Sequence, residues 1–87
     1  MLRVTELIEN GSSYMEKTTF INKNTILSVT EDTYASRKIT ESRGTQVVVS
    51  KITVRLPEGA HTILALGNPD SIMTPPHPNS NKGILYG

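Results

Sequence analysis

One stretch of the chain, FINKNTILSVTED, holds the residue types of a calcium-binding loop. Asn22, Asn24 and Asp32 carry the oxygen atoms that Ca²⁺ prefers, and an EF-hand loop places such ligands at its positions 1, 3 and 5. That loop also needs glycine at position 6 and glutamate at position 12. Counted from Asn22, these positions hold Leu27 and Thr33, so the pattern fails and we expect no metal site.

The chain has two histidines, His61 and His77, that would be the first candidates for catalysis. Either catalysis or metal binding needs a second convergent base or ligand, and the spacing of the two residues suggests none. The chain also lacks cysteine, a G-x-S-x-G nucleophile motif and a glycine-rich phosphate loop. We therefore expect no catalytic residue, no metal, no cofactor and a protein that is not an enzyme.

A basic cluster in the polar arm 33–45 is the remaining set of side chains with distinctive chemistry. A basic arm with one aromatic residue suits contact with the phosphate of a nucleotide, RNA or DNA, and arginine grips phosphate with two hydrogen bonds. Acidic residues flank the cluster and largely cancel its charge, which is typical of a solvated surface. The candidate anion- or partner-binding residues are Tyr34, Arg37, Lys38, Arg43 and Arg55.

The length and composition indicate one small domain with a thin margin of stability. The chain has 87 residues and no cysteine, so no disulfide supports it, and we expect a homo-oligomer that buries more apolar surface. The formal net charge of +1 disfavours a dedicated nucleic-acid binder. No apolar run approaches the roughly 20 residues that span a bilayer, and no secretory apolar region is seen, so we expect a cytoplasmic protein without a membrane segment.

The first third of the chain shows the alternation of β-strands. LRVTELIENG predicts an opening strand that stops at the Asn10-Gly11 turn, although the spacing of Val4, Leu7 and Ile8 also permits a short helix. KTTFI at 17–21 is typical of a strand. A turn at 22–24 then precedes a strand in which Leu27 and Val29 share one face.

The middle of the chain contains the clearest hairpin. TQVVVSKITVRL, at 45–56, predicts a strand whose first part is apolar on both faces, which suggests cover on both sides. PEG at 57–59 is typical of a turn, and HTILAL predicts the partner strand, which gives a hairpin over 47–66. The preceding segment, 33–44, is interpreted as an extended strand with a turn at 42–44, or as a mobile loop.

The end of the chain combines a short helix with a proline-rich tail. Asn68 can cap a helix that begins at Pro69 and ends near residue 73, because Pro75 and Pro76 follow. The tail 74–87 is extended or disordered by composition. Its GILYG stretch supplies the candidate docking residues Ile84, Leu85 and Tyr86.

These signals predict a mainly β fold: a small antiparallel sheet or open barrel of roughly four to six strands, with one short C-terminal helical turn and an extended tail. Residues 1–73 form the domain, from which the arm 33–45 protrudes, and residues 74–87 form the tail. The exposed edges of such a sheet are available for pairing with a second copy.

Four stretches carry a resemblance to a known family. They are a strand ending in Asn-Gly, FIN before an I-x-x-V-x-E strand, an ITV-x-L-x-x-G hairpin and a proline-bearing turn, at 4–11, 20–31, 52–59 and 68–72. Their order resembles the small flagellar and swarming-motility proteins of the FlbD/SwrD type, and similar short proteins of phages and bacteria. The resemblance implies a compact antiparallel β domain with no active site carried over.

The leading functional hypothesis is a non-enzymatic binding or regulatory protein of phage or bacterial type. It would occupy the surface of a partner protein through the arm 33–45 and the tail 74–87, because long segments that the core does not need commonly carry function. The alternative is an oligomeric nucleotide- or nucleic-acid-binding module that uses Arg37, Arg43 and Arg55 against phosphate. A third hypothesis is a structural component of a larger assembly, with GILYG as its docking segment.

Overall fold

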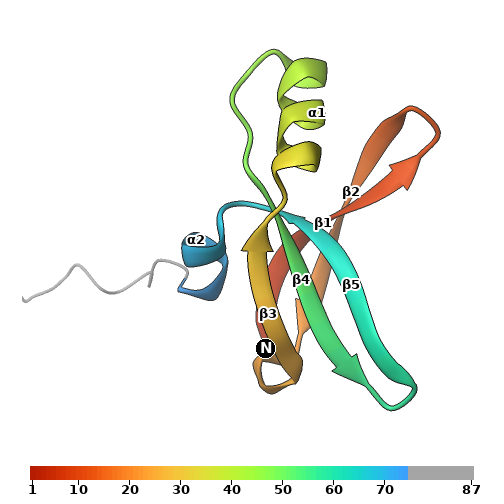
Figure 1. The fold of residues 1–87 in the computed structure, drawn as a ribbon, viewed down its shortest axis with the longest axis vertical. Coiled ribbons are helices and arrows are strands. Elements are labelled where there is room, and N and C mark those ends of the chain that lie inside the picture. The colour runs from red at the N-terminus through yellow and green to blue at the C-terminus, as the bar shows by residue number, and fades with distance from the viewer. Residues whose placement is uncertain (75–87) are drawn as a thin grey trace, which may run out of the picture.

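The computed structural model describes residues 1–74 and confirms a mainly β fold, with five antiparallel strands in one open sheet (Figure 1). The spatial order of the strands is β2-β1-β5-β4-β3. The elements in chain order are β1 (Leu2–Asn10), β2 (Ser13–Ile21), the 3-10 turn η1 (Lys23–Thr25), β3 (Ile26–Glu31), α1 (Thr33–Arg43), β4 (Val49–Leu56), β5 (Gly59–Leu66) and α2 (Pro69–Met73).

Two long hairpins form most of the sheet. The second is the hairpin that the sequence predicts, and in the first the predicted strand at 17–21 begins earlier, at Ser13. β1 and β2 pair along their whole length and turn at Asn10-Gly11, where Gly11 has a φ of 65°. This confirms the opening strand over the alternative of a short helix. β4 and β5 also pair fully, up to the Leu56–Gly59 pair that flanks the Pro57-Glu58 turn.

The two hairpins meet over a very short distance. β1 pairs with β5 at Glu6–Ala65 and Leu7–Leu64, and the strands then diverge. The β1–β2 hairpin therefore crosses the β3–β4–β5 sheet instead of extending it in register, as Figure 1 shows. The first half of β5, residues 59–63, keeps β4 on one side and has no β1 partner on the other.

The sheet is covered by a different helix on each face. On the face called here the α2 face, Ile72 of α2 packs with a core cluster whose strand members are Leu2, Val4, Ile21, Ile52, Val54 and Ala65. On the opposite face, called the α1 face, Ala35 and Ile39 of α1 pack with Leu7 and Val49. Val49 and Ile52 therefore belong to different clusters, which confirms that β4 is covered on both sides.

Strand β3 departs from the predicted alternation. We expected Leu27 and Val29 to share one face, but the register shifts between Ile26 and Ser28, which are paired with Val54 and Thr53. This bulge places Ile26 and Val29 against the core cluster of the α2 face and leaves Leu27 51% exposed. An extra residue in one strand reverses the facing of the residues beyond it, which a strict period of two cannot anticipate.

The prediction for the arm 33–45 is wrong: most of it forms helix α1 instead of an extended strand or a loop. Asp32 is the N-cap, and its side chain accepts a hydrogen bond from the backbone N–H of Ala35 at 3.0 Å. Gly44 ends the helix in the left-handed region, with a φ of 76°, and its N–H donates to Thr40. The turn expected at 42–44 is therefore the helix C-terminus.

Hydroxyl groups attach α1 to the chain that leads into β4. The Ser36 hydroxyl accepts a hydrogen bond from the Val49 N–H at 2.8 Å and donates to the Asp32 carbonyl at 2.7 Å. One turn later, the Thr40 hydroxyl accepts from the Val47 N–H at 2.9 Å and donates to the Val47 carbonyl at 3.1 Å. Each hydroxyl thus accepts a hydrogen bond from a backbone N–H of the segment that leads into β4.

Helix α2 confirms the predicted cap and start. The Asn68 side chain accepts a hydrogen bond from the Ser71 N–H at 2.8 Å, and Pro69 is the first helical residue. The helix is one short segment that seats Ile72, 7% exposed, on the core of the α2 face. The proline-rich tail, with His77, Ile84, Leu85 and Tyr86, lies almost entirely outside the described residues.

Removing the Ser36 hydroxyl should destabilise the protein. The Ser36→Ala substitution leaves the buried Val49 N–H without its acceptor, and we expect the free energy of unfolding to fall by about 1–3 kcal/mol. Ser42→Ala, the same substitution at an exposed position of the same helix, should change it by less than about 0.5 kcal/mol. Urea denaturation measures both values, and equal losses would contradict the proposed attachment.

Candidate functional site

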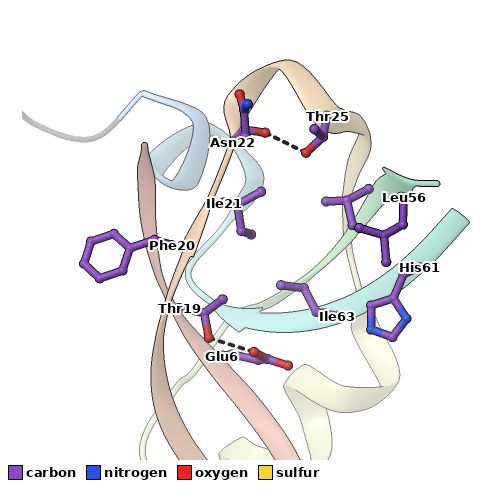
Figure 2. Close-up of a pocket in the computed structure, with 10 residues that line it drawn as sticks. Glu6, Thr19, Phe20, Ile21, Asn22, Thr25, Leu56, His61 and Ile63 are labelled. Carbon is purple, nitrogen blue, oxygen red and sulfur yellow. Dashed lines mark hydrogen bonds between the residues drawn. The ribbon is translucent and has the colours of Figure 1, made fainter.

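A groove on the α2 face lies where the β1–β2 hairpin crosses the end of the β4–β5 hairpin. Its volume is about 390 Å³, within the range of roughly 300–1,000 Å³ that is usual for ligand pockets. Figure 2 shows Ile21, Leu56 and Ile63 directed into it from three strands, with His61 at the side and Phe20 pointing away. The lining residues are Glu6, Thr19, Phe20, Ile21, Asn22, Thr25, Val54, Leu56, His61 and Ile63.

The strand registers explain why these side chains converge. Residues paired across an antiparallel ladder point to the same face, so Val54 with His61 and Ile52 with Ile63 all face the α2 side. The alternation then places Leu56 on that face as well. On the crossing hairpin, the pairing of Leu2 with Ile21 puts Ile21 on the same face. The groove therefore has apolar walls from two hairpins distant in sequence.

The polar groups of the groove sit at its rim and are held by local hydrogen bonds. The Thr19 hydroxyl donates to the Glu6 carboxylate at 2.8 Å, which fixes one acidic group on the wall formed by β1 and β2. In the turn between β2 and β3, the Thr25 hydroxyl donates to the Asn22 carbonyl at 2.7 Å, as Figure 2 shows. The site thus combines an apolar centre with a carboxylate on one side and an exposed imidazole, His61, on the other.

The groove adjoins the free edge of β5. Residues 59–63 pair with β4 alone, whereas β1 has diverged by that point. Since the side chains of His61 and Ile63 line the groove, the unpaired backbone edge and the apolar groove lie side by side. This arrangement suits an extended peptide, whose backbone can pair along the edge while an alternate side chain enters the groove.

The two outer edges of the sheet are less suited to pairing. β2 carries Glu16 and Lys17 at its centre, and charged side chains on an edge oppose the addition of another strand. β3 carries the bulge between Ile26 and Ser28, which disrupts a regular ladder. The edge of β5 at 59–63 contains no charged residue and no bulge.

The structure does not bring the basic residues predicted for phosphate binding together. Arg37 is exposed on the outer surface of α1. Arg43 instead forms an ion pair with Glu16 of β2, on the α1 face. Arg55 lies near the far end of β4, six residues and about 20 Å beyond the strand start that α1 covers.

Tyr34 and Lys38 form a separate pair on α1. The Lys38 ammonium lies 5.4 Å from the centre of the Tyr34 ring, within the range of a cation–π contact, and Tyr34 is 61% exposed. This pair occupies the outer surface of the helix, while Ala35 and Ile39 face the core. The arm therefore contributes an exposed surface of mixed charge, and none of its residues lines the groove.

No sequence pattern indicates the groove. Of its lining residues, the sequence singles out only Asn22 and His61 for possible chemistry, whereas Leu56 and Ile63 lie in predicted strands with no ligand assigned to them. The free edge and the groove depend on how far β1 pairs with β5, which no local pattern encodes. In the part of the chain that the structure describes, no group of three His, Asp or Glu side chains could hold a metal ion. No helix between residues 1 and 74 is long and apolar enough to cross a membrane.

The ion pair between Arg43 and Glu16 should contribute little to stability. Both side chains are substantially exposed, at 38% and 46%, so solvent screens the attraction. A double-mutant cycle with Arg43→Ala and Glu16→Ala should give a coupling free energy of about 0.2–1 kcal/mol, which decreases as salt is added. Arg37→Ala combined with Glu16→Ala is the matched control and should give a coupling near zero. A salt-independent coupling well above this range would contradict the assignment.

Comparison of the chain with protein-family models, with curated proteins and with solved structures gives no match. The resemblance to the FlbD/SwrD type and the expectation of a homo-oligomer therefore stay predictions.

Proposed function

We propose that this protein is a non-enzymatic binding module that holds an extended segment of a partner protein along β5. The observation that carries the proposal is the adjacency of an unpaired strand edge, residues 59–63, and the apolar groove lined by Ile63 and Leu56. In this mode the backbone hydrogen bonds give affinity, and the pockets for alternate side chains give specificity. The proposal keeps the leading hypothesis from the sequence, a protein partner, but places the main contact in the groove.

The chemistry of the groove defines the kind of segment that would bind. An aliphatic or aromatic side chain would be buried among Ile21, Leu56 and Ile63, and burial of one such side chain contributes about 1.5–3 kcal/mol. Residues on either side of it would point away from the sheet face, because side chains alternate along a strand. The preferred ligand is therefore an extended segment with one large apolar anchor and few constraints at its two neighbours.

A selection from a displayed library of random heptapeptides tests the proposal. We expect the enriched peptides to share one large apolar residue and to lose about tenfold in affinity, or roughly 1.4 kcal/mol, when Leu56 is replaced by Glu. Leu27→Glu is the matched control, because Leu27 is also an exposed strand leucine, at 51%, but lies outside the groove. Equal affinity for the two variants, or no enrichment, would contradict the proposal.

Salt dependence separates this function from the nucleic-acid alternative. Binding of a selected peptide should change less than about twofold between roughly 50 and 200 mM salt and should not respond to Arg37→Ala/Arg43→Ala. Three phosphate contacts would instead weaken binding by more than about tenfold over that range. Titration with a single-stranded oligonucleotide completes the test: tight, steeply salt-dependent binding that the double variant abolishes would favour the alternative.

A further inference from the structure

We propose that residues 82–86 of this same chain occupy the groove, so that the tail competes with any partner segment for the edge of β5. The inference rests on the proposed function, because it assigns an occupant to the same site. It connects the groove to the apolar GILYG stretch, which the described residues do not include.

The sequence of this segment has the pattern that the groove requires. In an extended conformation, Lys82, Ile84 and Tyr86 would share one face, and Gly83 and Leu85 would take the other. Ile84 would then be the apolar anchor, with a cation on one side and an aromatic hydroxyl on the other.

Charge complementarity fixes the direction of the segment. If it runs antiparallel to β5 with Ile84 opposite Ile63, Tyr86 lies opposite His61 and Lys82 reaches the level of Ala65. β1 occupies the place beside β5 from Leu64 onward, through the pairing of Leu7 with Leu64 and of Glu6 with Ala65. The segment must leave the edge there, and its ammonium group comes close to the Glu6 carboxylate, which Thr19 holds at the rim of the groove.

The connection is long enough for the segment to reach the groove of its own chain. Eight residue steps separate Thr74 from Lys82, a span of up to about 26–29 Å when extended. Met73 and Ile63 both pack against the core cluster of the α2 face, and α2 contacts β3. From β3 to β5 the sheet measures two strand spacings, about 10 Å. A short tether of this kind gives an effective concentration in the millimolar range, which favours the intramolecular contact.

Paired substitutions in the full-length chain test the inference. Ile84→Asp removes the anchor, and Leu85→Asp, which adds the same charge one residue away on the opposite face, is the matched control. We expect Ile84→Asp to shift the amide NMR signals of residues 60–63 and Glu6, and the synthetic peptide NKGILYG to reverse those shifts. The peptide should bind Ile84→Asp about tenfold more tightly than it binds the unaltered chain or Leu85→Asp.

Each other outcome has a defined meaning. If Ile84→Asp leaves the groove signals unchanged while a library-selected peptide still binds there, this inference fails and the proposed function stands. If no peptide of either kind binds, both fail. If the groove signals of the unaltered chain respond to its concentration and the mass in solution doubles, the segment comes from a second copy, and the intramolecular contact is wrong.

Discussion

The short contact between β1 and β5 is the constraint on which the rest of the structure depends. Two residue pairs, Glu6–Ala65 and Leu7–Leu64, join the two hairpins into one sheet. A longer ladder would have covered the edge of β5 and kept the hairpins aligned. Because the pairing stops after two positions, the β1–β2 hairpin crosses the other strands, and this crossing creates both the free edge and the groove. The proposed function therefore depends on the pairing of β1 with β5 stopping at Leu64.

The remaining elements stabilise this arrangement from both sides. Helix α1 covers the α1 face and is tied to the start of β4 by the hydroxyls of Ser36 and Thr40. Helix α2 closes the opposite face with Ile72, beside the same core residues that continue into the groove wall. A chain this short buries a limited share of its surface, and two small helices allow it to bury apolar side chains on both faces of one sheet. The groove is the part of the α2 face that α2 does not cover.

Local patterns predict the strands and helix α2 well but fail at helix α1, and the residues show why. The hairpins have alternating side chains and turn residues close in sequence, such as Asn10-Gly11, so the necessary information is local. Helix α1 has a small apolar stripe, Ala35 and Ile39, because its inner side also contacts the backbone before β4 through the hydroxyls of Ser36 and Thr40. The cap residues Asp32 and Gly44 are the sequence signal that indicates this helix. The groove depends on a contact between residues almost sixty positions apart, so sequence alone could not reveal it.

Amide hydrogen exchange at the edge of β5 tests the central claim most directly. The measurement compares exchange rates of residues 60–63 in the presence and absence of a library-selected peptide, with the free edge of β3 at 28–31 as an internal reference. If the peptide adds as a strand beside β5, amides of 60–63 that face the free edge slow markedly and those of β3 do not change. Unchanged exchange along β5 under saturating peptide, or equal slowing at both edges, would contradict the account.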